Sequence, residues 1–140
     1  MTDNVIQSQI RLITFKAVRL EFACVNEILE PKFNLGLDDL VFPDNPKLFA
    51  KVFNIDLVVG LQTESISYKI GYHAVFECSM AITSDFLNSD FAKISAPAIG
   101  FPYVRSFIST ISVQAGLPPI ILPSINFVQY SHEKEARLKG

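Results

Sequence analysis

The sequence predicts an α+β protein in which a sheet of long antiparallel strands is followed by helices. Period-two alternation of apolar residues, the signature of a strand, runs through residues 8–23, 48–62 and 66–82. From residue 84 onward, apolar residues recur at helical spacing instead. Apolar residues make up 49% of the 140 residues and charged residues 19%, a composition that excludes a wholly disordered chain.

Residues 8–23 predict the first long strand. Residues of one parity are mostly apolar: Ile10, Leu12, Thr14, Lys16, Val18, Leu20 and Phe22. The other parity is mixed but still contains Ile13 and Phe15. Because successive side chains of a strand point to opposite faces, we expect one covered face and one face that is partly open to solvent.

A long connection follows over residues 24–47 and contains several turn-forming residues, Pro31, Gly36, Pro43 and Pro46. Within it, alternation of Phe33, Leu35 and Leu37 predicts a short strand over residues 32–37. A connection of this length is usually functional or carries a strand of its own.

Residues 48–62 and 66–82 predict a β-hairpin closed by the polar turn at residues 62–65. Apolar residues share one face of its first strand, and one cation lies among them: Phe49, Lys51, Phe53, Ile55, Leu57, Val59 and Leu61. The second strand alternates most regularly, with Ile66, Tyr68, Ile70, Tyr72 and Phe76 on one face. Strands this long form a large sheet, which needs a covering layer on at least one face.

Helices are predicted after residue 83. Phe86, Leu87, Phe91 and Ile94 favour a helix over residues 84–94, with Ser84 or Asp85 as its N-cap. The segment 96–100, Ala-Pro-Ala-Ile-Gly, is expected to break the chain. Residues 128–139 carry mixed charges and predict a frayed terminal helix.

The main helix is predicted from Pro102 to Ala115, with Gly116 as its stop signal. Its apolar stripe consists of Val104, Phe107, Ile108, Ile111 and Ala115, and its other face of Ser106, Ser109, Thr110 and Ser112. Arg105 is the only charge, so this helix is poorly suited to a solvated surface. We therefore expect it to be packed on both sides.

Several classes of protein are disfavoured. No run of roughly 20 apolar residues suits a membrane span, and a net charge of −2 without a basic stripe argues against binding nucleic acid. Asp3 stands where a signal peptide would carry basic residues, so a cytoplasmic protein is expected. Cys24 and Cys78 are then two reduced, buried cysteines, with a disulfide between them as the alternative.

Catalytic or metal-binding patterns are not evident, and we expect neither an enzyme nor a cofactor or metal. His73 and His132 are far apart, and the carboxylates at residues 38–39 and 133–135 suit solvated loops and tails. The informative residue is phenylalanine, which occurs 12 times. Those outside the strand alternation are either ordinary core or anchors of an apolar groove for extended polypeptide: Phe33, Phe42, Phe86, Phe91 and Phe101.

One stretch resembles a known family. The segments Gly-Phe-Pro-Tyr-Val-Arg at residues 100–105, Gly-Leu-Pro-Pro at 116–119 and Pro-Ser-Ile-Asn-Phe at 123–127 are similar in order and spacing to the most distinctive part of SecB, the bacterial protein-export chaperone. The resemblance implies a four-stranded antiparallel sheet with helices packed on one face. It further implies a single domain over residues 1–140, with the sheet at 8–82 including the crossover loop 24–47, a helical layer at 84–127 and a C-terminal helix or tail at 128–140.

The resemblance also implies a function and an assembly. It implies an ATP-independent holdase that binds unfolded or precursor polypeptides. The assembly is a homotetramer, a dimer of dimers, with Val104, Phe107, Ile108 and Ile111 of the main helix at the interface. The implied polypeptide groove lies between the crossover loop and the helical layer, at Phe33, Leu35, Leu37, Phe42, Phe101, Tyr103, Ile120 and Ile121.

One departure from the family concerns the SecA motor, which SecB meets through acidic residues on the exposed sheet face. Glu21 keeps one such acid, but Ala17 and Lys69 stand where two others are expected. A cation at a site that meets a basic partner is repulsive. A SecB-like chaperone dedicated to a specific partner, such as an antitoxin, and not coupled to SecA is therefore the alternative. An enzyme or small-ligand carrier on a half-barrel sheet is a third, weaker hypothesis.

Overall fold

Four long antiparallel strands form a single sheet in the computed structural model, which describes residues 10–139 and side chains as far as residue 137. The strands are β1 (Ile10–Val25), β2 (Lys32–Val41), β3 (Leu48–Gly60) and β4 (Ser65–Cys78), in the spatial order β1-β4-β3-β2. The helices are α2 (Ser84–Leu87), the π-helix η1 (Phe91–Ser95), α3 (Ala96–Gln114) and α4 (Phe127–Lys139). This confirms the α+β fold with a four-stranded antiparallel sheet. The predicted first strand begins at residue 8, and residues 8 and 9 lie outside the described part.

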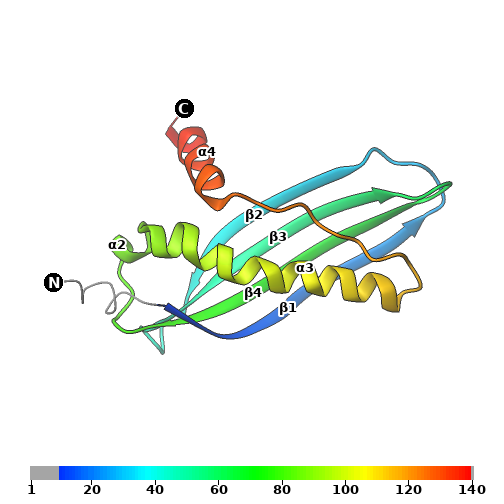
Figure 1. Ribbon diagram of the computed structural model, residues 1–140. Coiled ribbons are helices and arrows are strands. Elements are labelled where there is room, and N and C mark those ends of the chain that lie inside the picture. The colour runs from blue at the N-terminus through cyan, green and yellow to red at the C-terminus, as the bar shows by residue number, and fades with distance from the viewer. Residues whose placement is uncertain (1–9, 140) are drawn as a thin grey trace.

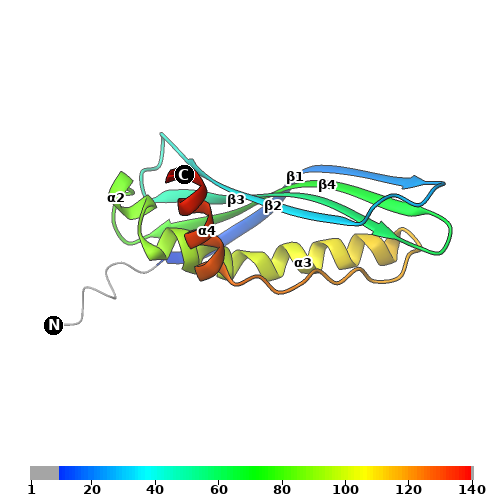
Figure 2. The same ribbon diagram turned by 90° about the horizontal axis from the view of Figure 1, so that it is seen from above.

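The molecule has two layers. Helix α3 runs along one face of the sheet, and the linker after it returns alongside α3 to α4, which stands at the β2 edge (Figures 1 and 2). The core lies between α3 and the central strands. Its largest fully buried side chains include Phe49, Phe53, Tyr68 and Phe76, all on the face that the sequence predicts to be apolar. No helix in the described part of the chain is long and apolar enough to cross a bilayer.

The predicted crossover loop over residues 24–47 contains the complete edge strand β2. This strand begins at Lys32, as the alternation predicts, but continues to Val41 instead of ending at residue 37. The alternation of residues 33–37 fades at Asp38 and Asp39. Pairing with β3 nevertheless carries the strand on, with Val41 opposite Phe49.

Two irregularities in β1 correct the predicted alternation of the first strand. Between Leu12 and Thr14, and again between Ala17 and Arg19, β1 advances two residues while β4 advances one. Each extra residue is a bulge, and a shift of one residue moves the following side chains to the other face.

The stretch between the two bulges is therefore inverted. Phe15 and Ala17 lie on the face covered by helices, because their partners in β4 are Ala74 and Tyr72. Thr14 and Lys16, which the simple alternation places with Leu12, lie on the opposite face.

The helix predicted over residues 84–94 is divided. Helix α2 ends at Leu87 and is followed by a turn and then by η1. Its N-cap is Thr83 rather than Ser84 or Asp85, because the Thr83 hydroxyl accepts a hydrogen bond from the Phe86 N–H at 3.0 Å.

The break predicted at residues 96–100 is wrong, because η1 and α3 form one continuous helical segment there. Pro97 lies in the first turn of α3, directly after the change from π to α geometry, and Pro102 lies inside α3. A π-helical turn moves hydrogen-bond partners by one residue, which accommodates a residue without an N–H. The predicted start at Pro102 is therefore six residues late.

Ser112 corrects the predicted polar face of the main helix. It is fully buried, and its hydroxyl donates to the Ile108 carbonyl at 2.7 Å. Its oxygen therefore accepts from the Tyr68 hydroxyl, 2.6 Å away, which satisfies a buried phenol of β4. Burial raises the pKa of Tyr68, so this phenol stays protonated at neutral pH.

The two cysteines are free and lie at opposite ends of the sheet. Cys24 pairs with Ile66 near the start of β4, whereas Cys78 ends that strand. At about 3.4 Å per residue they are roughly 40 Å apart, which excludes the alternative of a disulfide within the chain. Cys24 is exposed rather than buried as predicted, and burial raises the pKa of Cys78 to about 11.

Native thiol labelling is therefore expected to modify one cysteine per chain. At pH 8 a thiol with a pKa of about 11 is roughly 0.1% thiolate, against about a quarter for an ordinary thiol. Together with burial, this makes Cys78 at least about a hundredfold slower than an ordinary exposed thiol. Colorimetric titration with a disulfide reagent should count one fast thiol in buffer and two in denaturant. Fast labelling of a Cys24→Ser variant under native conditions would contradict the burial of Cys78.

Candidate functional site

Exposed apolar side chains gather where β1 passes under α3. This surface, the β1–α3 patch, consists of Phe15, Leu20, Phe22 and Tyr103. Phe15 is 46% and Tyr103 41% exposed, and their ring centroids are 4.6 Å apart. The first bulge creates the contact, because it turns Phe15 toward the helices. A cluster of large exposed apolar side chains usually marks a contact with another polypeptide.

The opposite flank of α3 is closed by α4. Strand β2 is an edge strand, so half of its backbone groups face away from the sheet. Two of its carbonyls accept hydrogen bonds from α4: Leu35 from the Tyr130 hydroxyl at 3.1 Å, and Leu37 from the Lys134 ammonium at 2.5 Å. Side chains of α4 thus cover an edge that is otherwise open to pairing with another strand.

A row of aromatic rings connects α4 to the core. Phe101 of α3 lies 6.2 Å from Phe53 and 5.7 Å from Phe127, measured between ring centroids. Phe127 in turn lies 6.2 Å from Tyr130. The rings and the two hydrogen bonds to β2 together set the position of α4.

A cavity of about 180 Å³ with charged side chains in its wall lies between α4, η1 and the β2–β3 pair. Three lysines line it, and we call it the three-lysine cavity: Lys51, Lys93 and Lys134, with the carboxylates of Asp39 and Glu135. Lys51 donates to Asp39 at 2.7 Å, and Lys93 to Glu135 at 3.2 Å.

Lys51 is the most unusual of these groups, because its side chain is only 5% exposed. Burial lowers the pKa of Lys51, and the nearby cations Lys134 and Lys93 lower it further, whereas the hydrogen bond to Asp39 opposes the shift. In the sequence, Lys51 is the cation among the apolar residues on one face of the predicted strand 48–62. Nothing in the local sequence indicated that Lys93 and Lys134 would join it.

The eight residues predicted to bind polypeptide do not line one cavity. Leu37 lines the three-lysine cavity, Leu35 lines a more open hollow, and Ile120 and Ile121 line a third hollow of about 230 Å³ beside Pro102. Phe101 is buried in the core, Phe33 and Phe42 are half-buried in and just after β2, and Tyr103 belongs to the β1–α3 patch.

The four predicted interface residues fall into two pairs. Val104 and Ile108 are fully buried in the core, so they cannot touch a second chain directly. Phe107 and Ile111 are half-buried, and Phe107 packs on Tyr72 with ring centroids 5.4 Å apart. The large exposed apolar residues of α3 are Ile99, Tyr103 and Val113.

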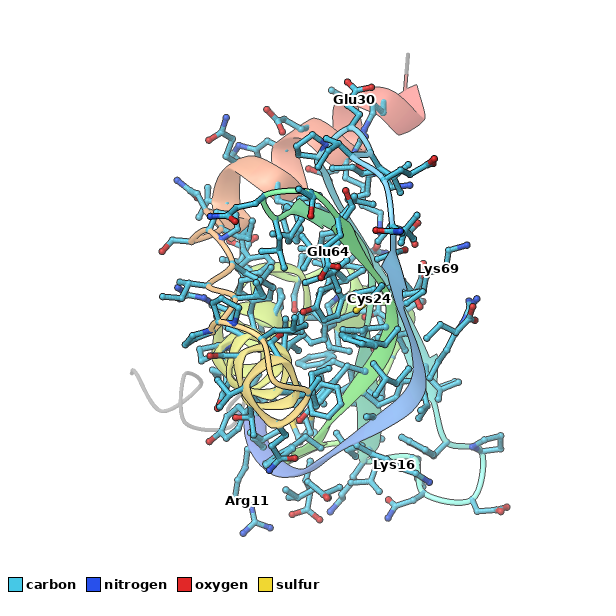
Figure 3. The ribbon with its side chains drawn as sticks, turned by 90° about the vertical axis from the view of Figure 1, so that its right-hand side faces the viewer. Arg11, Lys16, Cys24, Glu30, Glu64 and Lys69 are labelled. Carbon is cyan, nitrogen blue, oxygen red and sulfur yellow. The ribbon has the colours of Figure 1, made fainter. Side chains whose placement is uncertain are left out.

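On the exposed sheet face, Glu21 lies opposite Lys69 in the neighbouring strand and forms an ion pair with Arg19. Lys16 and Lys69 project from the side of the sheet that faces away from α3 (Figure 3). Ala17 does not belong to this face, because the first bulge turns it toward the helices. The prediction that Ala17 replaces an acidic residue on this face is therefore wrong. The departure from the acidic residues of the family rests on Lys69.

Comparison with known proteins gives a consistent picture. Residues 3–137 match the family model of the preprotein translocase subunit SecB. The chain is 34% identical over 100 residues to the protein-export protein SecB of Paraburkholderia xenovorans, which covers 67% of this chain and 62% of that protein. It is also 61% identical over 36 residues to an uncharacterised protein of Methanocaldococcus jannaschii, 26% of this chain and 23% of that protein. The chain thus spans less than two thirds of the length of these relatives.

A solved structure has the same fold. The SecB-like chaperone of Mycobacterium tuberculosis, in complex with a ChAD peptide from the HigA1 antitoxin, matches with a TM-score of 0.67. The match covers 87% of this chain and 93% of that one, at 17% sequence identity. At this identity the likeness concerns the arrangement of strands and helices.

Proposed function

Because this chain belongs to the SecB family, we propose that it is an ATP-independent molecular chaperone, a holdase, that binds unfolded or precursor polypeptides in the cytoplasm. It needs no catalytic centre or cofactor for this role, since holding depends on contact area alone. The observation that supports the proposal best is the exposed apolar surface that a lone chain leaves on the β1 flank of α3, the β1–α3 patch. Unfolded chains expose apolar segments, and burial of such segments drives association.

We propose that polypeptide contacts fall on the accessible members of the predicted set, Phe33, Leu35, Phe42, Tyr103 and Ile121. The buried members Leu37, Phe101 and Ile120 then shape the surface from beneath. Large apolar and aromatic side chains suit this purpose, because their contribution to affinity depends on the apolar area that is buried rather than on the exact sequence of the bound polypeptide.

A refolding assay tests the holdase. A denatured enzyme diluted into buffer without nucleotide should regain activity several-fold more slowly at a stoichiometric amount of this protein than with serum albumin. A double variant, Phe33→Ser with Ile121→Ser, should lose most of the delay. Met80→Ser, at a strongly exposed apolar residue outside the set (62%, against 78% for Ile121), should keep it. No delay with the wild-type protein would overturn the proposal.

We further propose a homotetramer, a dimer of dimers, assembled through α3. Support comes from Val113 and Ile99 on its exposed face, and from half-buried Phe107 and Ile111. Val104 and Ile108 then act indirectly, because they hold α3 on its own sheet.

Val113→Asp is therefore expected to dissociate the tetramer. A carboxylate buried at a contact without a partner costs roughly 3 kcal/mol, which corresponds to a dissociation constant about a hundredfold higher. Native mass spectrometry should detect dimers or monomers of the variant. The control is Val128→Asp, a similarly exposed valine on α4 (46% against 51%), which should stay tetrameric. A monomeric wild-type protein would contradict the assembly.

A chaperone dedicated to one partner, without SecA coupling, is the second candidate. Its support is Lys69, a cation that lies between Glu21 of β1 and Asp56 of β3 on the exposed sheet face. Affinity purification from the native host distinguishes the two. Many precursors together with SecA favour the export role, whereas one dominant partner without SecA favours the dedicated role.

A further inference from the structure

The three-lysine cavity combines burial with an excess of positive charge. Three ammonium groups, of Lys51, Lys93 and Lys134, face it together with two carboxylates, of Asp39 and Glu135. The ordinary charges therefore leave an excess of one positive charge. The Lys51 ammonium interacts more strongly with other charges than a surface lysine does, because its side chain is only 5% exposed, whereas Lys93 and Glu135 are 29% and 46% exposed.

The three ammonium groups also have spare hydrogen-bonding capacity. Each lysine has three N–H donors. Among the described residues Lys51 uses one for Asp39, Lys93 one for Glu135 and Lys134 one for the Leu37 carbonyl. Each lysine therefore keeps donors that these bonds do not use, and all three residues line the same space of about 180 Å³. The plain alternative is that ordered water fills this space.

The cavity lies at the flank where β2 and α4 meet. Leu37 and Tyr130 line it, and both take part in the contacts that close the β2 edge. Leu37 also belongs to the predicted polypeptide-binding set. A polypeptide that passes over the outer side of the cavity, where Lys93 and Glu135 are partly exposed, would therefore carry its side chains past it.

We propose that the three-lysine cavity takes the carboxylate of an aspartate or glutamate side chain of a bound, extended polypeptide. A single carboxylate cancels the excess positive charge and offers acceptors to the spare ammonium donors. The cavity, of about 180 Å³, has room for such a side chain. This inference rests on the proposed holdase function and adds to it a preference for apolar segments that contain an acid.

Two fluorescent peptides that differ only in one central Glu or Gln, flanked by apolar residues, provide the test. Anisotropy with the wild-type protein should give a dissociation constant at least about tenfold lower for the Glu peptide. Lys93→Gln and Lys134→Gln should each reduce this preference several-fold, whereas Lys69→Gln, on the opposite face of the sheet, should leave it unchanged. Circular dichroism confirms that each variant is folded, and Lys51 is left intact because of its place in the core.

The outcomes separate this inference from the proposed function. If the protein delays refolding but binds both peptides equally, the proposed carboxylate site is wrong and the proposed holdase function is kept. A further outcome is that acetate shifts the lysine side-chain NMR signals while the two peptides bind with equal affinity. That result identifies a site for small anions only and also overturns the inference. If neither peptide binds and refolding is not delayed, the holdase itself is wrong.

Discussion

Gly100→Leu is expected to lower the free energy of unfolding by about 3 kcal/mol. A Cβ atom at position 100 would lie 3.0 Å from the Ala74 Cβ and 3.1 Å from two ring carbons of Phe53. Ala74 belongs to β4, and the Phe53 ring is fully buried beside Phe101, so neither neighbour has room to move. Helix α3 must therefore rise from the sheet to accept a larger side chain.

Urea denaturation followed by circular dichroism measures this effect. The matched control is Ala98→Leu, two residues earlier in the same helix, where the side chain is exposed and a change of about 0.5 kcal/mol or less is expected. Gly100→Ala should lie between the two, because its gain in helix propensity, about 1 kcal/mol, offsets part of the clash. Equal stability of the two leucine variants would show that α3 does not pack closely at residue 100.

Asp39→Asn is expected to destabilise the protein by about 3 kcal/mol, because it leaves the buried Lys51 ammonium without its carboxylate. The nearby cations Lys93 and Lys134 add to this cost by repulsion. The value lies at the low end of the range for a broken buried ion pair, since Asp39 is 29% exposed.

Removal of the cation has a different result. Lys51→Met keeps the volume of the side chain and is expected to be neutral or slightly stabilising, since the desolvation of the ammonium disappears and water can solvate Asp39, which is 29% exposed. In the double variant, Lys51→Met should recover most of the loss caused by Asp39→Asn. The control is Asp38→Asn on the exposed face of β2, where about 0.5 kcal/mol or less is expected. A Lys51→Met variant as unstable as Asp39→Asn would contradict this account.

The lowered pKa of Lys51 adds a dependence on pH. The folded chain releases this proton at a lower pH than the unfolded chain, whose pKa is near 10.5. The stability that Lys51 contributes is therefore smallest at neutral pH and increases as the pH rises through the lowered pKa toward 10.5. The difference between the wild type and Lys51→Met should change in this direction, whereas the tyrosines with raised pKa values affect both proteins alike.

Local sequence pattern is sufficient to predict the hairpin and the apolar side of the main helix. Alternation over residues 48–62 and 66–82 identified the hairpin and the faces of β3 and β4, because a strand's side chains alternate wherever the strand lies. Helical spacing identified the apolar side of α3. The motifs at residues 100–127 indicated the family from the order and spacing of their residues alone.

Features that depend on a neighbouring element could not be predicted in this way. The bulges in β1 exist only in its pairing with β4, and they turn Phe15 into the β1–α3 patch and Ala17 away from the exposed face. Pro97 looked like a helix breaker because its sequence context does not reveal the π-helical turn before it.

The three-lysine cavity is the clearest example of a feature that tertiary structure creates. Lys51, Lys93 and Lys134 come from three separate elements, so no sequence period relates them. A repeating sequence pattern indicates which side of a helix or strand is buried. A bulge or a cavity depends on the residues of the neighbouring element, and only folding brings these residues together.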